Sequence, residues 1–129
     1  MRSLTLSVLT DTYSVCRLPA DALIPDCLST CPSEFCSVTR TADELSIVCA
    51  SRLVPADAAS EPGWRCLKVA GPLDFEMVGV MADLTRTLAE AQISVFVVST
   101  YETDYVLVRA ECLSAAIQTL RSSGHSILR

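Results

Sequence analysis

Residues 64–109 place their apolar side chains in an order that few folds accommodate: strand, turn, helix, strand, hairpin tip and strand. Residues 64–70 form an apolar run that predicts a strand, and the following Gly-Pro pair predicts a turn. From Asp74 to about Ala91, apolar residues return at the spacing of an amphipathic helix, and Asp74 suits its N-cap. Residues 93–98 are apolar on both faces, which predicts a central strand covered by helices.

The C-terminal part of the sequence supplies the remaining elements of this pattern. Residues 105–109 predict a strand that pairs back on residues 93–98. Apolar residues between positions 113 and 120 fall on one face of a second helix, which Gly124 is placed to end. Residues 126–128 can add a last short strand. The second half therefore predicts a β-α-β-β-α-β unit, the arrangement of ferredoxin-like modules.

The first half repeats this pattern in a weaker form. Residues 13–18 resemble residues 64–69 at a distance of 51 positions (64 − 13), and residues 39–48 resemble residues 99–108 at a distance of 60 (99 − 39). A helix shortened by about nine residues in the first half explains both distances. We therefore expect an α+β fold of two ferredoxin-like modules (βαββαβ), residues 1–62 and 63–129, the first degenerate with a shortened helix.

The degenerate first module has recognisable strands and breaks. Residues 4–9 and 13–18 predict two strands joined as a hairpin, which Pro19 ends. Residues 20–28 leave room only for a short helix, because Pro25 interrupts it. Residues 35–40 and 45–50 then predict two strands around a polar tip. Residues 55–63, which are small, acidic and closed by Pro-Gly, predict the linker between the modules.

Composition narrows the classes of function. The chain has 129 residues, of which 50% are hydrophobic and 19% charged, a globular composition with a net charge of −5. The absence of a Lys/Arg cluster argues against a nucleic-acid partner. No apolar run approaches the roughly 20 residues of a membrane helix, and the first eleven residues do not resemble a signal peptide. These features predict a cytoplasmic protein without a membrane partner.

Cysteine and histidine usage does not indicate a metal site or a catalytic site. Seven cysteines cannot all pair within one chain, so reduced thiols are expected. Cys27, Cys31 and Cys36 lack the spacing of a zinc site and have no histidine nearby, although a redox role for a loop thiol stays open. His125 is the only histidine and has no patterned nucleophile partner. With no phosphate loop either, the sequence predicts no catalytic residue, no metal and no cofactor.

Several motifs together resemble one family, the tandem ACT-domain proteins related to the CASTOR-type arginine sensors and to the regulatory domains of aspartate kinases. The motifs of this sequence that carry the resemblance are ELSIVC at residues 44–49, WRCLKV at 64–69, GPLDF at 71–75, Gly79, IS at 93–94 and STYETDYVLV at 99–108. The resemblance spans both halves. It departs from the family pattern at Glu76 and Val78, where Ser and Thr are common, so the ligand here can differ.

The resemblance implies binding without chemistry, because ACT modules hold an amino acid where two modules meet. The ligand contacts of the family lie in the strand–helix turn and on the facing strands. Carried over to this sequence, the ligand-binding residues are Gly71, Pro72, Leu73, Asp74, Phe75, Ser99, Thr100, Thr103 and Asp104, with Thr39 to Glu44 in the first module able to complete a site.

The chemistry of an amino acid agrees with such a site. The turn that begins at Gly71 leads into a helix whose first N–H groups carry a partial positive charge and can receive a carboxylate. Asp104 or Glu44 could bind the ammonium group. The same residues also suit an ordinary turn, helix cap and hairpin tip that bind nothing. The prediction is therefore an amino-acid-binding regulatory module, and the alternative is a ligand-free protein-interaction scaffold of ACT fold; exposed strand edges favour a homodimer for either.

Overall fold

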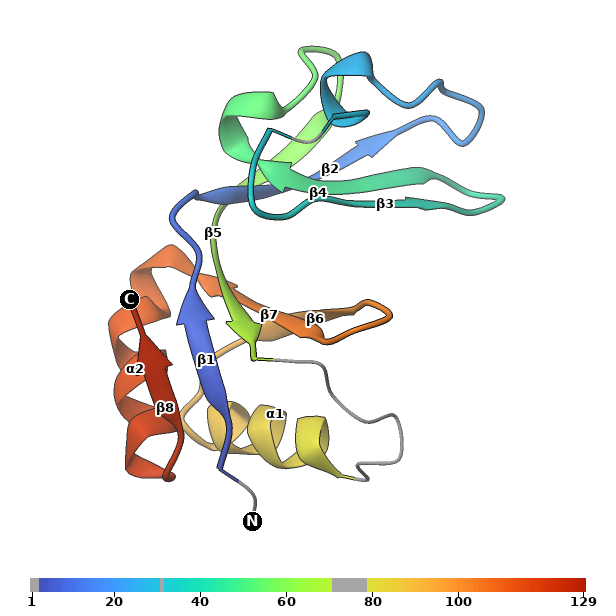
Figure 1. The fold of residues 1–129 in the computed structure, drawn as a ribbon. Helices are drawn as coiled ribbons and strands as arrows, with labels where there is room; N and C mark the ends of the chain where they lie inside the picture. Colours follow the sequence, from blue (N-terminus) through green and yellow to red (C-terminus); the bar gives the residue numbers. More distant parts are fainter. Residues whose placement is uncertain (1–2, 31, 71–78) are drawn as a thin grey trace. The chain divides into compact units, whose positions relative to one another are not determined.

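The computed structural model of the protein describes residues 3–30, 32–70 and 79–129 (Figure 1). The contacts divide the chain into two compact units. One unit combines Met1–Thr10 with Arg65–Arg129 and carries both α-helices, so it is called the two-helix unit. The other is Asp11–Trp64, called the central unit. Within the described segments, no helix has the length and hydropathy that a membrane crossing requires.

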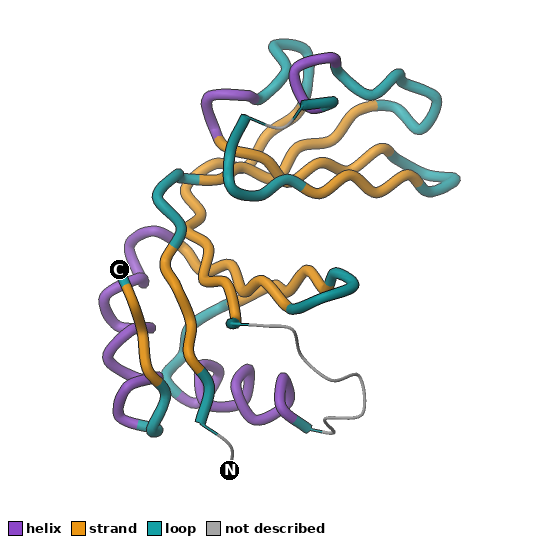
Figure 2. The backbone as a smooth tube through the Cα atoms, viewed as in Figure 1, coloured by secondary structure: helices purple, strands orange, loops and turns teal. Residues whose placement is uncertain are grey.

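The two-helix unit is a sheet with the strand order β6-β7-β5-β1-β8 and two helices (Figures 1 and 2). β6 and β7 form an antiparallel hairpin, and β5 pairs with β7 on one side and β1 on the other. The elements are β1 (Thr5–Val8), the C-terminal part of β5 (Ala59–Val69), α1 (Val80–Glu90), β6 (Val95–Ser99), β7 (Asp104–Arg109), the 3₁₀ turn η3 (Ala110–Cys112), α2 (Leu113–Ser122) and β8 (Ser126–Leu128).

One hydrophobic core joins the helices to the sheet of this unit. Helical spacing puts the apolar residues of α1 and α2 on one face each, and alternation puts every second strand residue on the same side of the sheet. A helix over residues 113–120 and an end at Gly124, where φ is +97°, are confirmed. The buried side chains of this core include Leu6, Leu67, Val69, Leu84, Leu88, Val106, Val108, Ala116, Leu120 and Ile127.

The first strand of the chain does not form the expected hairpin with residues 13–18. β1 lies between β5, to which it is antiparallel, and β8, to which it is parallel. Leu6 stands opposite Val69 on one side and Ile127 on the other. The hairpin expectation was wrong because sequence neighbours are only the usual partners of a strand, and Leu4 and Leu6 bury their side chains in the two-helix core instead.

β6 also differs from its expectation. It was expected to be a central strand, but among the described residues it pairs only with β7 and so lies at an edge of the sheet. Its apolar residues are only partly buried. A run that is apolar on both faces indicates a strand correctly but does not by itself give that strand a place in the sheet.

The central unit repeats the strand order of the two-helix unit without its helices. The sheet order is β3-β4-β2-β5, which corresponds to β6-β7-β5-β1 (Figure 2). Single 3₁₀ turns stand where the first helix and the start of the second would be, so the first helix is reduced further than expected. The elements are β2 (Tyr13–Leu18), η1 (Asp26–Leu28), β3 (Ser37–Arg40), β4 (Leu45–Ala50), η2 (Ser51–Leu53) and the N-terminal part of β5.

The expected linker at residues 55–63 is only partly a loop. β5 already begins at Ala59, and residues 59–64 pair with β2. The register shifts between Tyr13 and Val15, opposite Pro62 and Gly63, and Gly63 has a φ of +88°. Pro-Gly therefore lies in a bulge of a paired strand, where a missing N–H and a positive φ are both tolerated. The division into modules 1–62 and 63–129 stays a prediction.

His125 joins the start of β1 to the segment that precedes β8. Its ring is buried, and Nδ1 accepts a hydrogen bond of 3.0 Å from the backbone N–H of Leu4. Because Nδ1 is an acceptor, the neutral ring carries its proton on Nε2. Burial lowers the pKa of His125 below its usual value of 6.5.

We expect acid to destabilise the protein through this ring. The folded-state pKa lies below the unfolded value, so the contribution of neutral His125 is complete above about pH 6.5 and is lost as pH falls through the folded pKa. Urea unfolding between about pH 7.5 and about pH 5.5 should show stability falling with pH. His125→Asn, whose amide oxygen can accept from Leu4, should show a flatter profile; equal slopes in both proteins would contradict the assignment.

Candidate functional site

Four of the expected ligand residues lie together on the β6–β7 hairpin tip. Ser99 and Asp104 are the last cross-strand pair, and the Ser99 hydroxyl donates to Asp104 Oδ1. Between them, the N–H of Thr100 donates to the carbonyl of Thr103 at 2.8 Å, and the Thr100 hydroxyl contacts the same carbonyl at 3.1 Å. The tip is thus a four-residue turn closed by threonine, with a serine–aspartate pair at its base.

Thr103 ties this tip to the end of β5. Its side chain is 5% exposed, and Oγ1 donates to the carbonyl of Val69 at 2.7 Å. Val69 is the last residue of β5, two positions before Gly71. The five expected ligand residues of the strand–helix turn, which are Gly71, Pro72, Leu73, Asp74 and Phe75, lie outside the described residues. The hairpin tip is therefore anchored at the end of β5.

The central unit carries a second tip with the same hydrogen bonds. The N–H of Thr41 donates to the carbonyl of Glu44 at 2.9 Å, and the N–H of Glu44 contacts the Thr41 hydroxyl at 3.2 Å. Arg40 and Leu45 form the cross-strand pair at its base. Thr39 is exposed and Glu44 partly buried. Both Thr39 and Glu44 thus lie at a tip, but in the other unit.

Matching the two tips by their hydrogen bonds and cross-strand pairs changes the distance between corresponding residues of the repeat. Arg40 corresponds to Ser99 and Thr41 to Thr100, a distance of 59 positions (99 − 40), not 60. Glu44 consequently corresponds to Thr103, and not to Asp104 as the sequence similarity suggested. A slip of one residue exchanges the faces of a strand, so the central tip does not repeat the Ser99–Asp104 pair.

Arg40 makes a contact beside the second tip that sequence reasoning missed. Its guanidinium donates through Nη1 to the carbonyl of Ala20 and through Nη2 to the carbonyl of Ala22, the latter at 2.8 Å. These carbonyls belong to the segment that follows β2. The sequence signal that could have found this contact is a basic residue at the base of a hairpin tip. The expected repeat distance of 60 residues aligned Thr39, and not Arg40, with Ser99.

The cysteines of the central unit form part of its core. The six described cysteines are free, and Cys16 and Cys49 lie in the core with Leu18, Leu45 and Ile47. Burial raises the pKa of Cys16, and it raises the pKa of Cys49 to about 12. Both thiols are therefore protonated at neutral pH and are poor metal ligands or nucleophiles. Cys27 is exposed, Cys36 partly buried, and Cys31 outside the described residues.

The ionisable side chains of the described residues were compared with the requirements of a metal centre. Across residues 3–30, 32–70 and 79–129, no group of three or more His, Cys, Asp or Glu side chains is placed to hold a metal ion. The chemistry that these segments do offer is recognition by hydrogen bonds: an exposed serine–aspartate pair on one tip and a guanidinium–carbonyl contact beside the other.

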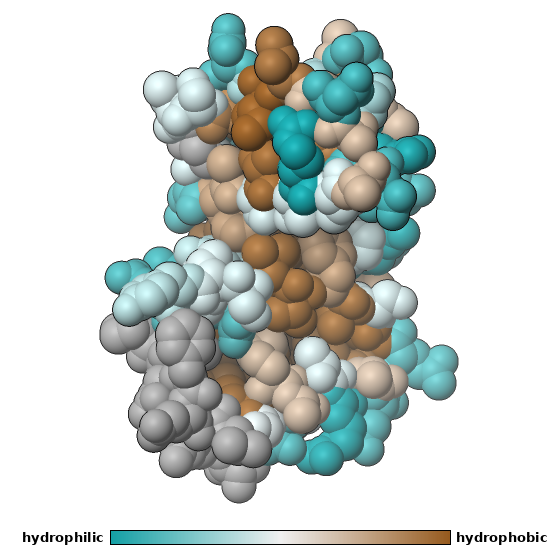
Figure 3. All heavy atoms as spheres, turned by 90° about the vertical axis from the view of Figure 1, so that its right-hand side faces the viewer, coloured by the Kyte–Doolittle hydropathy of each residue, from teal (hydrophilic) through white to brown (hydrophobic). Residues whose placement is uncertain are grey.

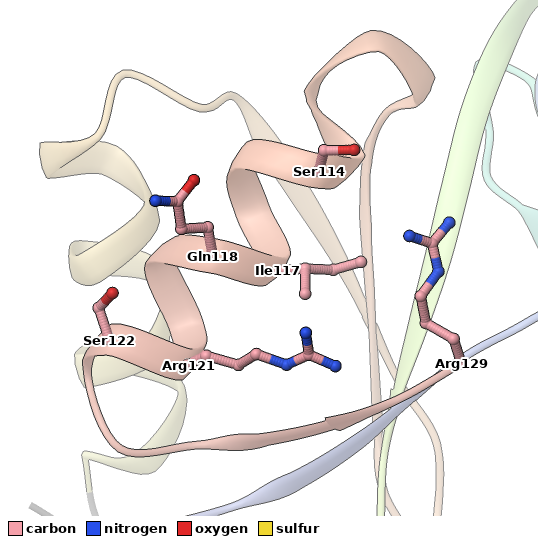
Figure 4. A pocket seen from close by; sticks show the side chains of 6 residues that line it. All are labelled: Ser114, Ile117, Gln118, Arg121, Ser122 and Arg129. Carbon is pink, nitrogen blue, oxygen red and sulfur yellow. The ribbon is translucent and has the colours of Figure 1, made fainter.

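Surface depressions of the two-helix unit lie elsewhere. One of about 480 Å³ has Arg121 and Arg129 extending over the same side of α2 (Figure 4). Two guanidinium groups suit a carboxylate or phosphate, but Arg121 already donates to the carbonyl of Ile127 at 2.8 Å. A second, of about 650 Å³, lies between α1 and the start of β6. Among the described residues, neither depression includes an expected ligand residue.

Comparison with known families agrees with the fold. Residues 59–122 match the family model of the ACT domain. These residues belong to the ACT-domain family. A second family model, described as an N-terminal domain, matches residues 11–57 of this ACT protein. The predicted class, an α+β fold of ferredoxin-like ACT type, is confirmed.

Individual proteins are similar to this chain in sequence or in fold. It is 38% identical to an Agrobacterium tumefaciens protein of known crystal structure, with a TM-score of 0.90 over 99% of this chain and 94% of the other. A 59-residue segment is 34% identical to the human cytosolic arginine sensor for mTORC1 subunit 1, covering 45% of this chain but only 18% of that protein. The regulatory subunit of Thermus thermophilus aspartate kinase shares the fold, with a TM-score of 0.66 at 10% identity over 95% and 99% of the two chains.

Proposed function

We propose that this ACT protein is a non-catalytic regulatory module that binds an amino acid or a similar small ligand at an interface between ACT modules. The observation that carries the proposal is the bond from Thr103 to Val69, which fixes the hairpin tip at the end of β5, two positions before Gly71 in the sequence. In this proposal Asp104, oriented by Ser99, binds the cationic group of the ligand, and the turn receives its carboxylate.

Arginine is the first ligand to test. The human relative is described as an arginine sensor, although its match covers a small part of that protein. A guanidinium group is planar and can bond with both Asp104 and backbone carbonyls. Binding would shift the population toward one arrangement of the modules and so give the protein a regulatory output. In the same proposal the protein is cytoplasmic, as its relative is described to be, and a homodimer, since β6 offers an edge to a second chain.

A ligand should raise the melting temperature, and Asp104 should be required. At a ligand concentration of about a hundred times Kd, binding stabilises the folded state by about 3 kcal/mol, or roughly 10 °C for a chain of this size. A thermal-shift screen of the standard amino acids on the wild type and on Asp104→Asn is expected to show this rise only in the wild type.

Glu102→Gln is the matched control, because Glu102 is an exposed acid on the same tip. It should keep the ligand-dependent rise. If none of the amino acids shifts the wild type, or if Asp104→Asn responds as the wild type does, the proposed site is wrong.

The alternative is a ligand-free protein-interaction scaffold, and exposed apolar side chains favour it. Leu23 is 89% exposed and Tyr101 85% exposed, and brown hydrophobic surface is visible in both units (Figure 3). Exposed apolar residues of this size often mark a contact with another protein. A negative amino-acid screen together with loss of self-association in Leu23→Ser would favour the scaffold over the sensor.

A further inference from the structure

We infer that the central unit contains a seat for a guanidinium group, formed by the carbonyls of Ala20 and Ala22, and that Arg40 of the same chain occupies it. The contact has the form that a planar guanidinium favours. Two different nitrogens of one guanidinium, Nη1 and Nη2, donate to two carbonyls two residues apart. A lysine ammonium is a point charge and cannot reproduce such a fork.

The seat has the same place in the repeat as part of the proposed ligand site. Leu18 ends β2 as Val69 ends β5, at a distance of 51 positions (69 − 18). Ala20 and Ala22 therefore correspond in sequence to the expected ligand residues Gly71 and Leu73. Arg40 thus connects the tip of the central unit to the segment that follows β2.

The two carbonyls that bind the Arg40 guanidinium lie in a hydrogen-bonded turn. The segment is a turn in which the N–H of Ala22 donates to the carbonyl of Pro19 at 3.0 Å, and it continues into the exposed Leu23. Within the described residues Arg40 forms no ion pair, so its guanidinium is recognised through the hydrogen bonds to the two carbonyls. Such a seat selects for the shape and donor geometry of the cation more than for its charge.

Where it concerns the ligand, this inference rests on the proposed function. It adds the number of ligands bound per chain. Because Arg40 already occupies the two carbonyls, the central unit binds no external cation there. Ser99, the counterpart of Arg40, has a short side chain bonded to Asp104 instead. We therefore expect one ligand per chain, bound by the two-helix unit, in place of the two that a symmetrical repeat would hold.

Chemical rescue tests the seat. Arg40→Ala is expected to melt lower than the wild type by roughly 3–6 °C, because two charge-assisted hydrogen bonds are lost. Methylguanidinium at about 10 mM should raise the melting temperature of Arg40→Ala by about 2 °C or more, whereas methylammonium at the same ionic strength should not. In the same titration, the backbone amide NMR signals near Ala20 and Ala22 should shift.

Arg17→Ala is the matched control, because Arg17 is an exposed arginine on β2 of the same unit. It should show no rescue beyond the wild type. If Arg40→Ala does not fold, Arg40→Lys keeps the charge and most of the stem, and it should respond to methylguanidinium in the same way. Equal responses of the Arg40 variant, the wild type and Arg17→Ala would overturn the seat.

The outcome can be separated from that of the proposed function. Rescue of Arg40→Ala with no amino acid binding to the wild type would support the seat and reject the sensor. Amino-acid binding without rescue would do the opposite. Isothermal titration that finds two ligands per wild-type chain would overturn the stoichiometry, since Arg40 would then not close the central unit.

Discussion

Leu6→Ala is expected to lower the free energy of unfolding by about 3 kcal/mol, the largest effect among the changes considered. Leu6 is fully buried and stands between Val69 of β5 and Ile127 of β8. Truncation to alanine removes the transfer free energy of its side chain and leaves a cavity in the two-helix core. Urea denaturation monitored by circular dichroism measures the loss as a lower midpoint at an unchanged slope.

Leu128→Ala is the matched control, since the same atoms are removed from a neighbouring strand whose leucine is 57% exposed. It should change stability by less than about 0.5 kcal/mol. If Leu6→Ala proves as mild as Leu128→Ala, then β1 does not belong to the core of the two-helix unit. Hydrogen exchange of the backbone amides shows where Leu6→Ala loosens the fold. The amides of β5 and β8 that pair with β1 should lose protection first.

Thr103→Val should cost roughly 1–3 kcal/mol of stability, because it removes a buried donor and leaves the Val69 carbonyl without that partner. Valine has nearly the shape of threonine, so packing changes little and the loss reports the hydrogen bond. The same substitution should weaken any ligand of the proposed site, since the tip is then no longer held at the end of β5. Denaturation and ligand titration measure the two effects separately.

Thr87→Val offers a comparison in the same unit. The Thr87 hydroxyl donates to the carbonyl of Asp83 at 2.9 Å, but that carbonyl lies in α1, where helix hydrogen bonds already satisfy it. The cost should stay below about 0.5 kcal/mol with no effect on the ligand. A Thr103→Val protein that is as stable as the wild type would show that the tip is held by other contacts.

Local patterns predicted the elements well where they depend on nearby residues. The second helix, its end at Gly124 and the strands on either side of both tips follow from periodicity and turn chemistry, which act over a few positions. The ACT fold followed from motifs in both halves. The polar tips expected between these strands are present, and in each a threonine hydroxyl, that of Thr41 or Thr100, bonds the backbone two or three residues away.

Features that depend on distant partners could not be predicted in the same way. Leu6 has the alternation of any strand, and only the three-dimensional structure shows that its partners lie near Val69 and Ile127. Pro62 and Gly63 have the composition of a linker, yet a bulge accommodates them in a strand. Arg40 looked like an ordinary surface charge, because the carbonyls that it binds are 18 and 20 residues away.

The position of β1 has a consequence for the order of events during synthesis. The ribosome makes this strand before its partner β8, with the whole central unit in between. The central unit contains all four of its strands once residue 64 has emerged, so it can fold while β1 still has an unpaired backbone. The two-helix unit thus closes only after β8 has emerged, and until then a strand that two neighbours will later cover is open to chaperones or to other chains.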